Sequence, residues 1–151
     1  MLLNRQRLVW VGERQDAPGA WQMPQGGIDA GESAAAAAMR ELHEEVGTDK
    51  AEIIAESKAW LTYDLPRHLA KRSWSGRWRG QRQKWFLLRF TGEDRDVDVS
   101  RHHPPEFSSW RWVGIDALVG LAVSFKRPLY ECVVEEFRHL ATSFGSDREK
   151  A

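Results

Sequence analysis

The order of segments along the chain predicts an α/β fold, because strand-like and helix-like stretches are interleaved without an internal repeat. The helix-like stretches have the apolar spacing of amphipathic helices, and the strand-like ones are rich in β-branched and aromatic residues. At 151 residues the chain is long enough to bury one core. We therefore expect a single domain over residues 1–144 and a polar C-terminal tail over residues 145–151.

The first predicted helix has suitable capping residues at both ends. Ser33 is a good N-cap, the run after it is rich in strong helix formers, and Gly47 is the residue type favoured just past a helix end. One face is apolar at helical spacing: Ala35, Met39, Leu42 and Val46. We expect this face to pack against the core.

A second helix is expected to begin near Pro128, because proline suits the first helical turn. Its predicted apolar stripe consists of Leu129, Val133, Phe137, Leu140 and Phe144. Cys132 lies in the same run and is the single cysteine, so it cannot form an internal disulfide. We expect Cys132 to be a small buried hydrophobe.

The remaining structure is predicted to be strands and loops. The strands are expected at residues 7–13, 53–57, 59–63, 84–91 and 109–113. Residues 15–31 are rich in Gly, Pro and Gln and predict a loop. The aromatic side chains of the later strands are expected to be structural, since alternating aromatic runs typically mark a buried sheet face. These are Trp85, Phe86, Phe90, Trp110 and Trp112.

Composition argues against a membrane-spanning or secreted protein. No apolar run approaches the length needed to cross a bilayer, and the N-terminal residues carry charges where a signal peptide needs an apolar stretch. The formal net charge is zero, which argues against non-specific polyanion binding. We expect a cytoplasmic protein, monomeric or weakly oligomeric, with neither DNA nor a membrane as partner.

The charge is nevertheless unevenly distributed along the chain. From Arg67 to Arg89 there is no acid, and Trp74, Trp78 and Trp85 lie among eight cations. The cations are Arg67, Lys71, Arg72, Arg77, Arg79, Arg82, Lys84 and Arg89. Such a run is commonly a solvated loop, but its length and charge equally suit a segment that faces a polyphosphate.

Three acidic residues of the first predicted helix form the main candidate for chemistry. Glu41, Glu44 and Glu45 stand at i, i+3 and i+4, so they share one face, opposite the apolar one. Taken alone, such a cluster is more often a solvated surface. Carboxylate oxygens are also the ligands that Mg²⁺ prefers when it bridges a protein and substrate phosphates. The cluster is therefore a candidate magnesium site.

The glutamates belong to a longer pattern: Gly26, five residues, Glu32, seven residues, then Arg40, Glu41, Leu42, one residue, Glu44, Glu45, Val46 and Gly47. With each residue type at ~5–7%, seven fixed positions of this pattern match by chance on the order of once in 10⁸ to 10⁹ starting points. The pattern resembles the box of the Nudix hydrolases, with Thr48 in place of the usual aliphatic residue. The resemblance implies an α/β/α sandwich with a mixed β-sheet and a Mg²⁺-dependent hydrolase of phosphoanhydride bonds.

The resemblance also implies roles for individual residues. Glu44 and Glu45 match the metal ligands of the family, Glu41 joins them, and Gly26 is assigned to the same metal site. Glu106 matches a position that contributes a carboxylate to metal binding or base chemistry. Mn²⁺ is a possible substitute for Mg²⁺.

Two residues of the box are expected to support the ligands. Arg40 is within i, i+4 reach of Glu44 and could hold that carboxylate in one orientation, so we include it among the catalytic candidates. Glu32 precedes the helix, and a structural role is favoured over metal ligation. The general base is Glu106 or one of the helix glutamates.

Segments outside the box narrow the substrate. They are WQMPQGG, WLTYDLP, RGQRQKWFLLRFTG, PEFSSWRWV and VSFKRPLY. Together they resemble a subgroup that acts on triphosphorylated RNA 5′ ends or on dinucleoside polyphosphates. The preferred interpretation is removal of pyrophosphate from RNA, with hydrolysis of diadenosine tetraphosphate as the alternative. A binding module without turnover is disfavoured, because the box glutamates are intact.

Candidate substrate-binding residues lie in or near these segments. Phe125 lies in a short, polar-flanked turn, where an exposed ring could stack on a base while Lys126 contacts phosphate. The further candidates are Arg14, Tyr63, Gln83 and Lys84. No histidine pair has metal-ligand spacing.

The resemblance extends to the expected start of the fold. In the resembling proteins about a dozen residues precede the counterpart of Asn4 and form much of the first strand, so Met1, Leu2 and Leu3 match the middle of that strand. We expect an N-terminally truncated form whose strand ladder is partly unpaired.

Overall fold

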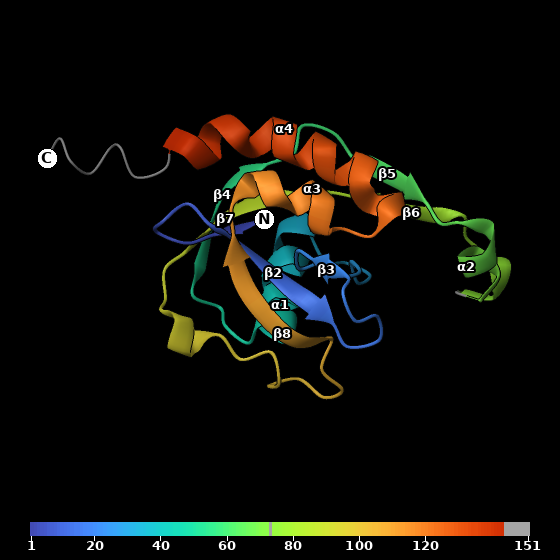
Figure 1. The fold of residues 1–151 in the computed structure, drawn as a ribbon, viewed down its shortest axis with the longest axis horizontal. Helices are drawn as coiled ribbons and strands as arrows, with labels where there is room; N and C mark the ends of the chain where they lie inside the picture. The colour runs from blue at the N-terminus through green and yellow to red at the C-terminus, as the bar shows by residue number, and fades with distance from the viewer. Residues whose placement is uncertain (73, 144–151) are drawn as a thin grey trace, which may run out of the picture.

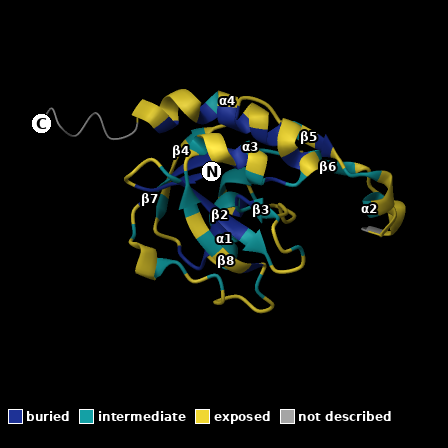
Figure 2. Ribbon diagram, viewed as in Figure 1, coloured by how far each residue is buried: buried dark blue, intermediate teal, exposed yellow. Residues whose placement is uncertain are grey.

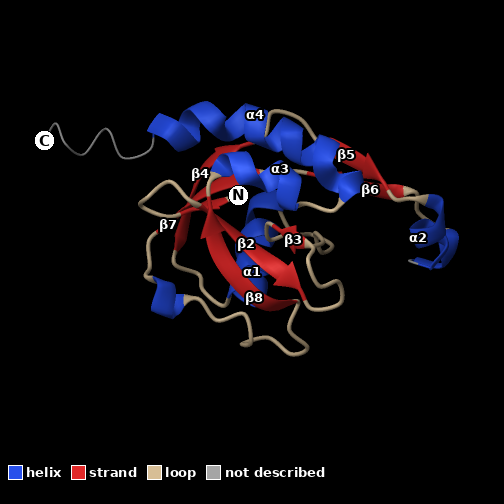
Figure 3. Cartoon of the chain, viewed as in Figure 1, coloured by secondary structure: helices blue, strands red, loops and turns tan. Residues whose placement is uncertain are grey.

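The computed structural model describes residues 1–72 and 74–143. In this part of the chain a six-stranded mixed sheet forms the centre, and helices lie on both of its faces (Figures 1 and 3). The strand order is β3-β2-β1-β7-β4, and β8 pairs with β2. This arrangement confirms the predicted α/β sandwich with a mixed sheet.

The central strands are short and mostly antiparallel. Their bounds are β1 Leu2–Leu3, β2 Val9–Arg14, β3 Trp21–Gln22, β4 Ala51–Glu56, β7 Phe86–Phe90 and β8 Phe107–Val113. β1 runs parallel to β7, whereas the other pairs are antiparallel. The predicted strands at 7–13, 53–57, 84–91 and 109–113 are thus confirmed with shifted ends, and the predicted loop at 15–31 contains the short strand β3.

Alternation along the strands separates two cores. On β2, Val9 and Val11 point into a cluster with Leu129, Val133 and Phe137 of the long C-terminal helix. Trp10, between them, points the other way, into a cluster built with the first helix. Because successive side chains of a strand face opposite sides, one strand serves both layers. The predicted core positions Trp85, Phe86 and Phe90 are all buried.

Helices cover the two faces of the sheet. They are α1 Ala34–Val46 on one face and, on the other, α3 Leu118–Leu121 and α4 Arg127–Ser143. Ser33 caps the start of α1 through its hydroxyl, which accepts a hydrogen bond from the Ala36 N–H, and Gly47 ends it with φ +82°. Both predicted caps are confirmed. No described helix combines the length and apolar character that a membrane crossing requires.

The predicted burial of α4 needs two corrections. Cys132 is exposed, because the buried side of α4 is formed by other residues of the helix, among them Tyr130, Val134 and Ala141. Leu140 is also exposed. Phe144 and the predicted tail lie outside the described residues.

The basic run adopts structure of its own. β5 Leu61–Asp64 and β6 Gly80–Gln83 form a separate antiparallel hairpin that carries the short helix α2 Arg67–Arg72. A 3₁₀ turn at Trp74–Gly76 follows α2. In Figure 1, α2 lies at the far end of the hairpin, away from the central sheet, and Figure 2 shows this end largely exposed. The predicted strand at 59–63 therefore belongs to the hairpin, not to the main sheet.

The N-terminal residue lies inside the protein. Met1 is 4% exposed, and its amino group donates a hydrogen bond of 2.7 Å to the Phe86 carbonyl oxygen. The Leu88 N–H donates to the Met1 carbonyl at 2.8 Å. Burial lowers the pKa of this amino group to about 5. β1 is thus an interior strand between β2 and β7.

Candidate active site

The end of the loop before α1 is held by one arginine. Arg40 donates to both Glu32 oxygens, at 2.8 and 3.0 Å, and to the Gly27 carbonyl at 2.7 Å. It also donates to Glu41 at 2.8 Å and, over a longer distance of 3.5 Å, to both oxygens of Glu44. The predicted contact between Arg40 and Glu44 is therefore present, but the shorter bonds of Arg40 go to Glu32, Glu41 and Gly27. The structural role expected for Glu32 agrees with these bonds, and the Arg40 guanidinium lowers the pKa of Glu32 to about 2.

Glu41 occupies a cradle beside the glycine loop. A Cβ added to Gly26 would overlap the Glu41 carboxylate, so only glycine allows this close approach. Burial raises the pKa of Glu41 from its usual value, although its bond to Arg40 opposes the shift. The structure thus brings Gly26 and Glu41 together, as the sequence predicted.

Glu45 is the most perturbed acid of the site. Its Oε2 accepts a hydrogen bond of 3.0 Å from the Gln25 N–H. Burial raises its pKa to about 9, despite that bond, and the negative charges of Glu106 and Glu41 add to the increase. A carboxylate in this position lacks sufficient positive charge nearby, which is the electrostatic situation that a divalent cation relieves.

The site contains the carboxylate oxygens that Mg²⁺ prefers as ligands, but in this structure they do not point toward one common position. Among the described residues, no group of three or more acidic, histidine or cysteine side chains is arranged to hold an ion. Glu41 is instead directed to Arg40, and Glu45 to the Gln25 N–H. The all-oxygen donor set, the raised pKa of Glu45 and the cradle at Gly26 fit a hard divalent cation.

Glu106 approaches the site from the segment before β8. Its Oε1 lies 3.8 Å from Arg14 Nη1, and its carbonyl accepts a hydrogen bond from the Gln15 N–H. Arg14 is bound more tightly by Asp16, through hydrogen bonds of 2.8 and 2.7 Å. The predicted residues Arg14 and Glu106 therefore lie side by side; the charge of Glu106 raises the pKa of Glu45, and that of Arg14 lowers the pKa of Lys126.

Lys126 is buried in the site, with 4% of its surface exposed. Its Nζ donates to Gln22 Oε1 at 3.2 Å and to Gln25 Oε1 at 3.0 Å. Burial, with the nearby charge of Arg14, lowers the pKa of Lys126 to about 8. Both hydrogen-bond acceptors are neutral amides, so among the described residues no carboxylate pairs directly with this ammonium.

Phe125 differs from the exposed ring that the sequence suggested. It is partly buried, packs against the α4 core, and lies 5.9 Å from the Tyr63 ring between centroids, at an interplanar angle of 33°. Tyr63 in turn has Lys126 Nζ 5.6 Å from its ring centroid. The candidates Tyr63, Phe125 and Lys126 thus form one group, because η4 (Ser124–Lys126) contacts β5.

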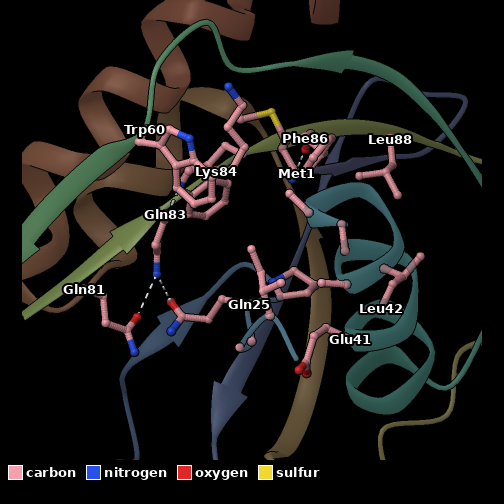
Figure 4. A pocket seen from close by; sticks show the side chains of 18 of the residues that line it. Met1, Gln25, Glu41, Leu42, Trp60, Gln81, Gln83, Lys84, Phe86 and Leu88 are labelled. Atoms are coloured by element: carbon pink, nitrogen blue, oxygen red, sulfur yellow. Dashed lines mark hydrogen bonds between the residues drawn. The ribbon is translucent and has the colours of Figure 1, made fainter. Parts of the chain in front are cut away.

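The candidates Gln83 and Lys84 line a cavity of about 340 Å³. Figure 4 shows Gln83 and Gln25 across from Glu41, with apolar residues such as Met1 and Leu88 at one side. Gln83 Nε2 donates to Gln25 Oε1 at 3.4 Å. The cavity therefore extends from Glu41 to the hairpin.

Of the four glutamines that form a network of side-chain amides, the sequence predicted only Gln83. Gln83 Nε2 and the Tyr63 hydroxyl both donate to Gln81 Oε1 at 3.0 Å, and Lys126 links Gln22 to Gln25. The signal that could have identified these residues is the recurrence of glutamine in WQMPQGG and GQRQK. Neutral amides can bind both Lys126 and a substrate without adding charge.

Comparisons with known proteins agree with this geometry. The NUDIX domain family matches residues 1–133. A protein of Rhodospirillum rubrum named RNA pyrophosphohydrolase is 55% identical over 141 residues, covering 93% of this chain and 85% of its own. A protein of Rickettsia rickettsii (strain Sheila Smith) with the same name is 50% identical over 141 residues, covering 93% of this chain and 87% of its own.

Solved structures show the same fold. The dihydroneopterin triphosphate pyrophosphohydrolase of E. coli superimposes with a TM-score of 0.68 at 26% identity, over 87% of this chain and 90% of its own. The Ap4A hydrolase of C. elegans, in a binary complex, gives 0.64 at 19% identity, over 95% and 96%. With the family match spanning most of the chain and these relatives along nearly its full length, the chain belongs to the NUDIX domain family.

Proposed function

We propose that this NUDIX protein hydrolyses a phosphoanhydride bond with Mg²⁺ and removes pyrophosphate from the 5′-triphosphate end of RNA. The proposal rests on one observation: carboxylates of α1 lie close to cations that are either buried or ion-paired. Gln25 contacts Glu45 through its N–H and Lys126 through its side chain, so acid and cation are two hydrogen bonds apart. Relatives named RNA pyrophosphohydrolase, at 50% to 55% identity, support RNA as the substrate.

Each side chain has a role that follows from its position. Glu45 and Glu44, with Glu41, would hold Mg²⁺, and Glu106 would complete the set from the other side. The ion, when bound, neutralises phosphate oxygens and activates water. Mn²⁺ can substitute, since it accepts the same oxygen ligands. Glu106 or one of the helix glutamates accepts the proton of the attacking water.

The remaining residues of the site position the substrate and its ligands. Arg40 fixes Glu41 and the Gly27 carbonyl through bonds of 2.8 and 2.7 Å. Lys126 and Arg14 bind the phosphate chain, whose negative charge compensates for the burial of the Lys126 ammonium. Phosphate binding by both cations places the scissile bond beside the α1 glutamates.

Dinucleoside polyphosphates are the second candidate substrate. The site offers two places for a nucleoside, the Tyr63 and Phe125 rings on one side and the cavity near Trp60 on the other. A substrate with a nucleoside at each end of its phosphate chain could use both. We also propose a cytoplasmic enzyme, monomeric or weakly oligomeric, that needs neither DNA nor a membrane.

The test compares triphosphorylated RNA, diadenosine tetraphosphate and GTP at several Mg²⁺ concentrations. We expect the highest kcat/KM on RNA, with release of pyrophosphate and no activity after chelation. An enzyme that prefers diadenosine tetraphosphate and releases ATP and AMP would replace the first candidate with the second. Full activity in chelator contradicts the metal assignment.

A further inference from the structure

We propose that the basic arm, residues 67–72 and 74–84, binds the single-stranded RNA that follows the 5′ end, as a second binding surface next to the active site. This inference rests on the proposed function, which provides RNA as the substrate. The arm comprises α2, the turn after it, β6 and Lys84. It carries seven of the eight cations of the basic run and no acid.

The cations at the end of the arm are available to a polyanion. Arg67, Lys71, Arg72 and Arg77 are exposed, and none of them forms an ion pair among the described residues. Arg79 pairs with Asp64 at 2.9 Å, but both side chains are largely exposed, so water screens this pair. Free exposed cations that are close together along a projecting element favour contacts with successive phosphates.

Aromatic rings lie among these cations. Trp78 is 62% exposed, and it stands between Arg77 and Arg79 in the sequence. Trp60, which directly precedes β5, is 41% exposed, and the Arg82 guanidinium carbon lies 4.6 Å from its ring centroid. Cations along a backbone path with exposed rings between them are the arrangement by which proteins bind single strands without sequence preference.

The arm is continuous with the active site. At its base, Gln83 bonds to Gln25, whose N–H bonds to Glu45. The same 340 Å³ cavity is lined by Glu41 and by the arm residues Arg82 and Lys84. Figure 4 shows Lys84 and Gln83 on the wall opposite α1. An RNA whose first phosphates lie at α1 can therefore pass through the cavity and reach the arm.

The chemistry of the arm favours RNA over a membrane surface. α2 has six residues, and its apolar members Leu69 and Ala70 are partly buried, so the helix has no free apolar face to enter lipid. An acidic protein partner would use the cations but would not need a path to Glu41. RNA uses the cations, the rings and the path together.

The test uses matched charge removals. The arm variant replaces Lys71, Arg72 and Arg77 by Gln, and the control variant replaces three exposed cations of the main body, Arg5, Arg95 and Arg138, by Gln. Both lose the same charge. Turnover is measured on GTP, a triphosphorylated dinucleotide and a triphosphorylated RNA of about twelve nucleotides. Binding of a 5′-hydroxyl RNA of that length is measured by fluorescence anisotropy at several salt concentrations.

We expect the arm variant to lose about 10-fold in kcat/KM on the long RNA and to leave GTP and the dinucleotide unchanged. The slope of log affinity against log salt for the 5′-hydroxyl RNA should flatten by about 2, because three single-strand contacts contribute ~0.7 each. Trp78→Ala should weaken long-RNA binding by about 5- to 100-fold, as loss of one stacked base would. The control variant should match the unaltered enzyme.

Equal kcat/KM on long RNA for the arm and control variants overturns the arm proposal and leaves the proposed function intact. Equal losses on GTP and long RNA also overturn it, because the cations would then act at the active site. If the enzyme binds anionic lipid vesicles but does not bind the 5′-hydroxyl RNA, the arm is a membrane-binding surface and the RNA proposal is wrong. An enzyme that hydrolyses GTP or diadenosine tetraphosphate but no RNA contradicts the proposed function, whatever the anisotropy shows.

Discussion

At the residue scale, the proposed metal ligand Glu45 destabilises the folded protein when no ion is bound to it. Its burial beside Glu41 and Glu106 raises its pKa to about 9, against 4.5 for an unperturbed glutamate. The folded protein then binds more protons than the unfolded chain between these two pH values. The stability of the metal-free protein therefore falls as pH rises through this window, by at most about 1.4 kcal/mol per pH unit.

Replacing Glu45 by Gln tests this charge balance. The variant should be more stable than the unaltered protein without metal at pH 8, and its pH dependence should be flatter, because the amide neither takes up a proton on folding nor leaves a buried charge. Mg²⁺ should raise the Tm of the unaltered protein and affect the variant much less, while turnover falls by orders of magnitude. Thermal unfolding with and without Mg²⁺ measures this. An unaltered Mg²⁺ response in the variant would remove Glu45 from the ligand set.

A second prediction at this scale separates base contacts from phosphate contacts. Phe125→Ala should lose about 5- to 100-fold on RNA or diadenosine tetraphosphate and much less on GTP, provided that the ring stacks on a base. Because Phe125 packs against Tyr63, some loss of Tm is also expected. Lys126→Met keeps the volume and should weaken all three substrates alike. Equal losses on all substrates for Phe125→Ala would make this ring a packing residue.

At the element scale, α1 was predictable because its signals are local. The Ser33 hydroxyl and the left-handed Gly47 mark its ends within the sequence itself. The β5–β6 hairpin was not, since the partner of residues 61–64 lies beyond α2 and no short-range turn signal announces the pairing. For the same reason the glutamine network was missed: Tyr63 contacts Gln81 only in the folded hairpin, and Gln25 contacts Gln83 only when the hairpin lies against the loop before α1.

The end of α1 provides a prediction for this element. Gly47 has φ +82°, and a Cβ there would overlap the backbone of Asp98, whose N–H donates to the Val46 carbonyl. Gly47→Ala should destabilise the fold by about 2 to 4 kcal/mol, from backbone strain and displacement of that loop. Gly114→Ala is the matched control, because Gly114 has φ −64° and open space around it. Similar urea midpoints for the two variants would refute the argument.

At the scale of the whole molecule, one sheet connects two cores, and β1 contributes to both. Leu2 packs with α1 and Leu3 with α4, and both are buried. The resemblance to the Nudix hydrolases predicted this layering, and the burial of successive residues along β2 and β7 agrees with apolar cover on both faces. No pattern in the sequence gives the rotamers of the α1 carboxylates, because their arrangement depends on Arg40 and on the Gln25 N–H. The residues that could bind a metal were thus predictable, but the positions of their carboxylate oxygens relative to one another were not.

Leu3→Ala tests the interior position of β1. Removing a fully buried side chain should cost about 2 to 5 kcal/mol, measured by urea denaturation. Leu140→Ala, on the exposed side of α4, should cost less than about 1 kcal/mol. If the two variants unfold at the same urea concentration, the core assignment of β1 is incorrect.

The exposed position of Cys132 has a practical consequence. It is the single cysteine of the chain, and it stands on the outer side of α4, whose opposite side carries the buried Tyr130 and Val134. A maleimide dye therefore attaches at one defined point without any engineered thiol. A donor there and an acceptor on the 3′ end of an RNA would report, by resonance energy transfer, the direction in which a bound strand leaves the protein.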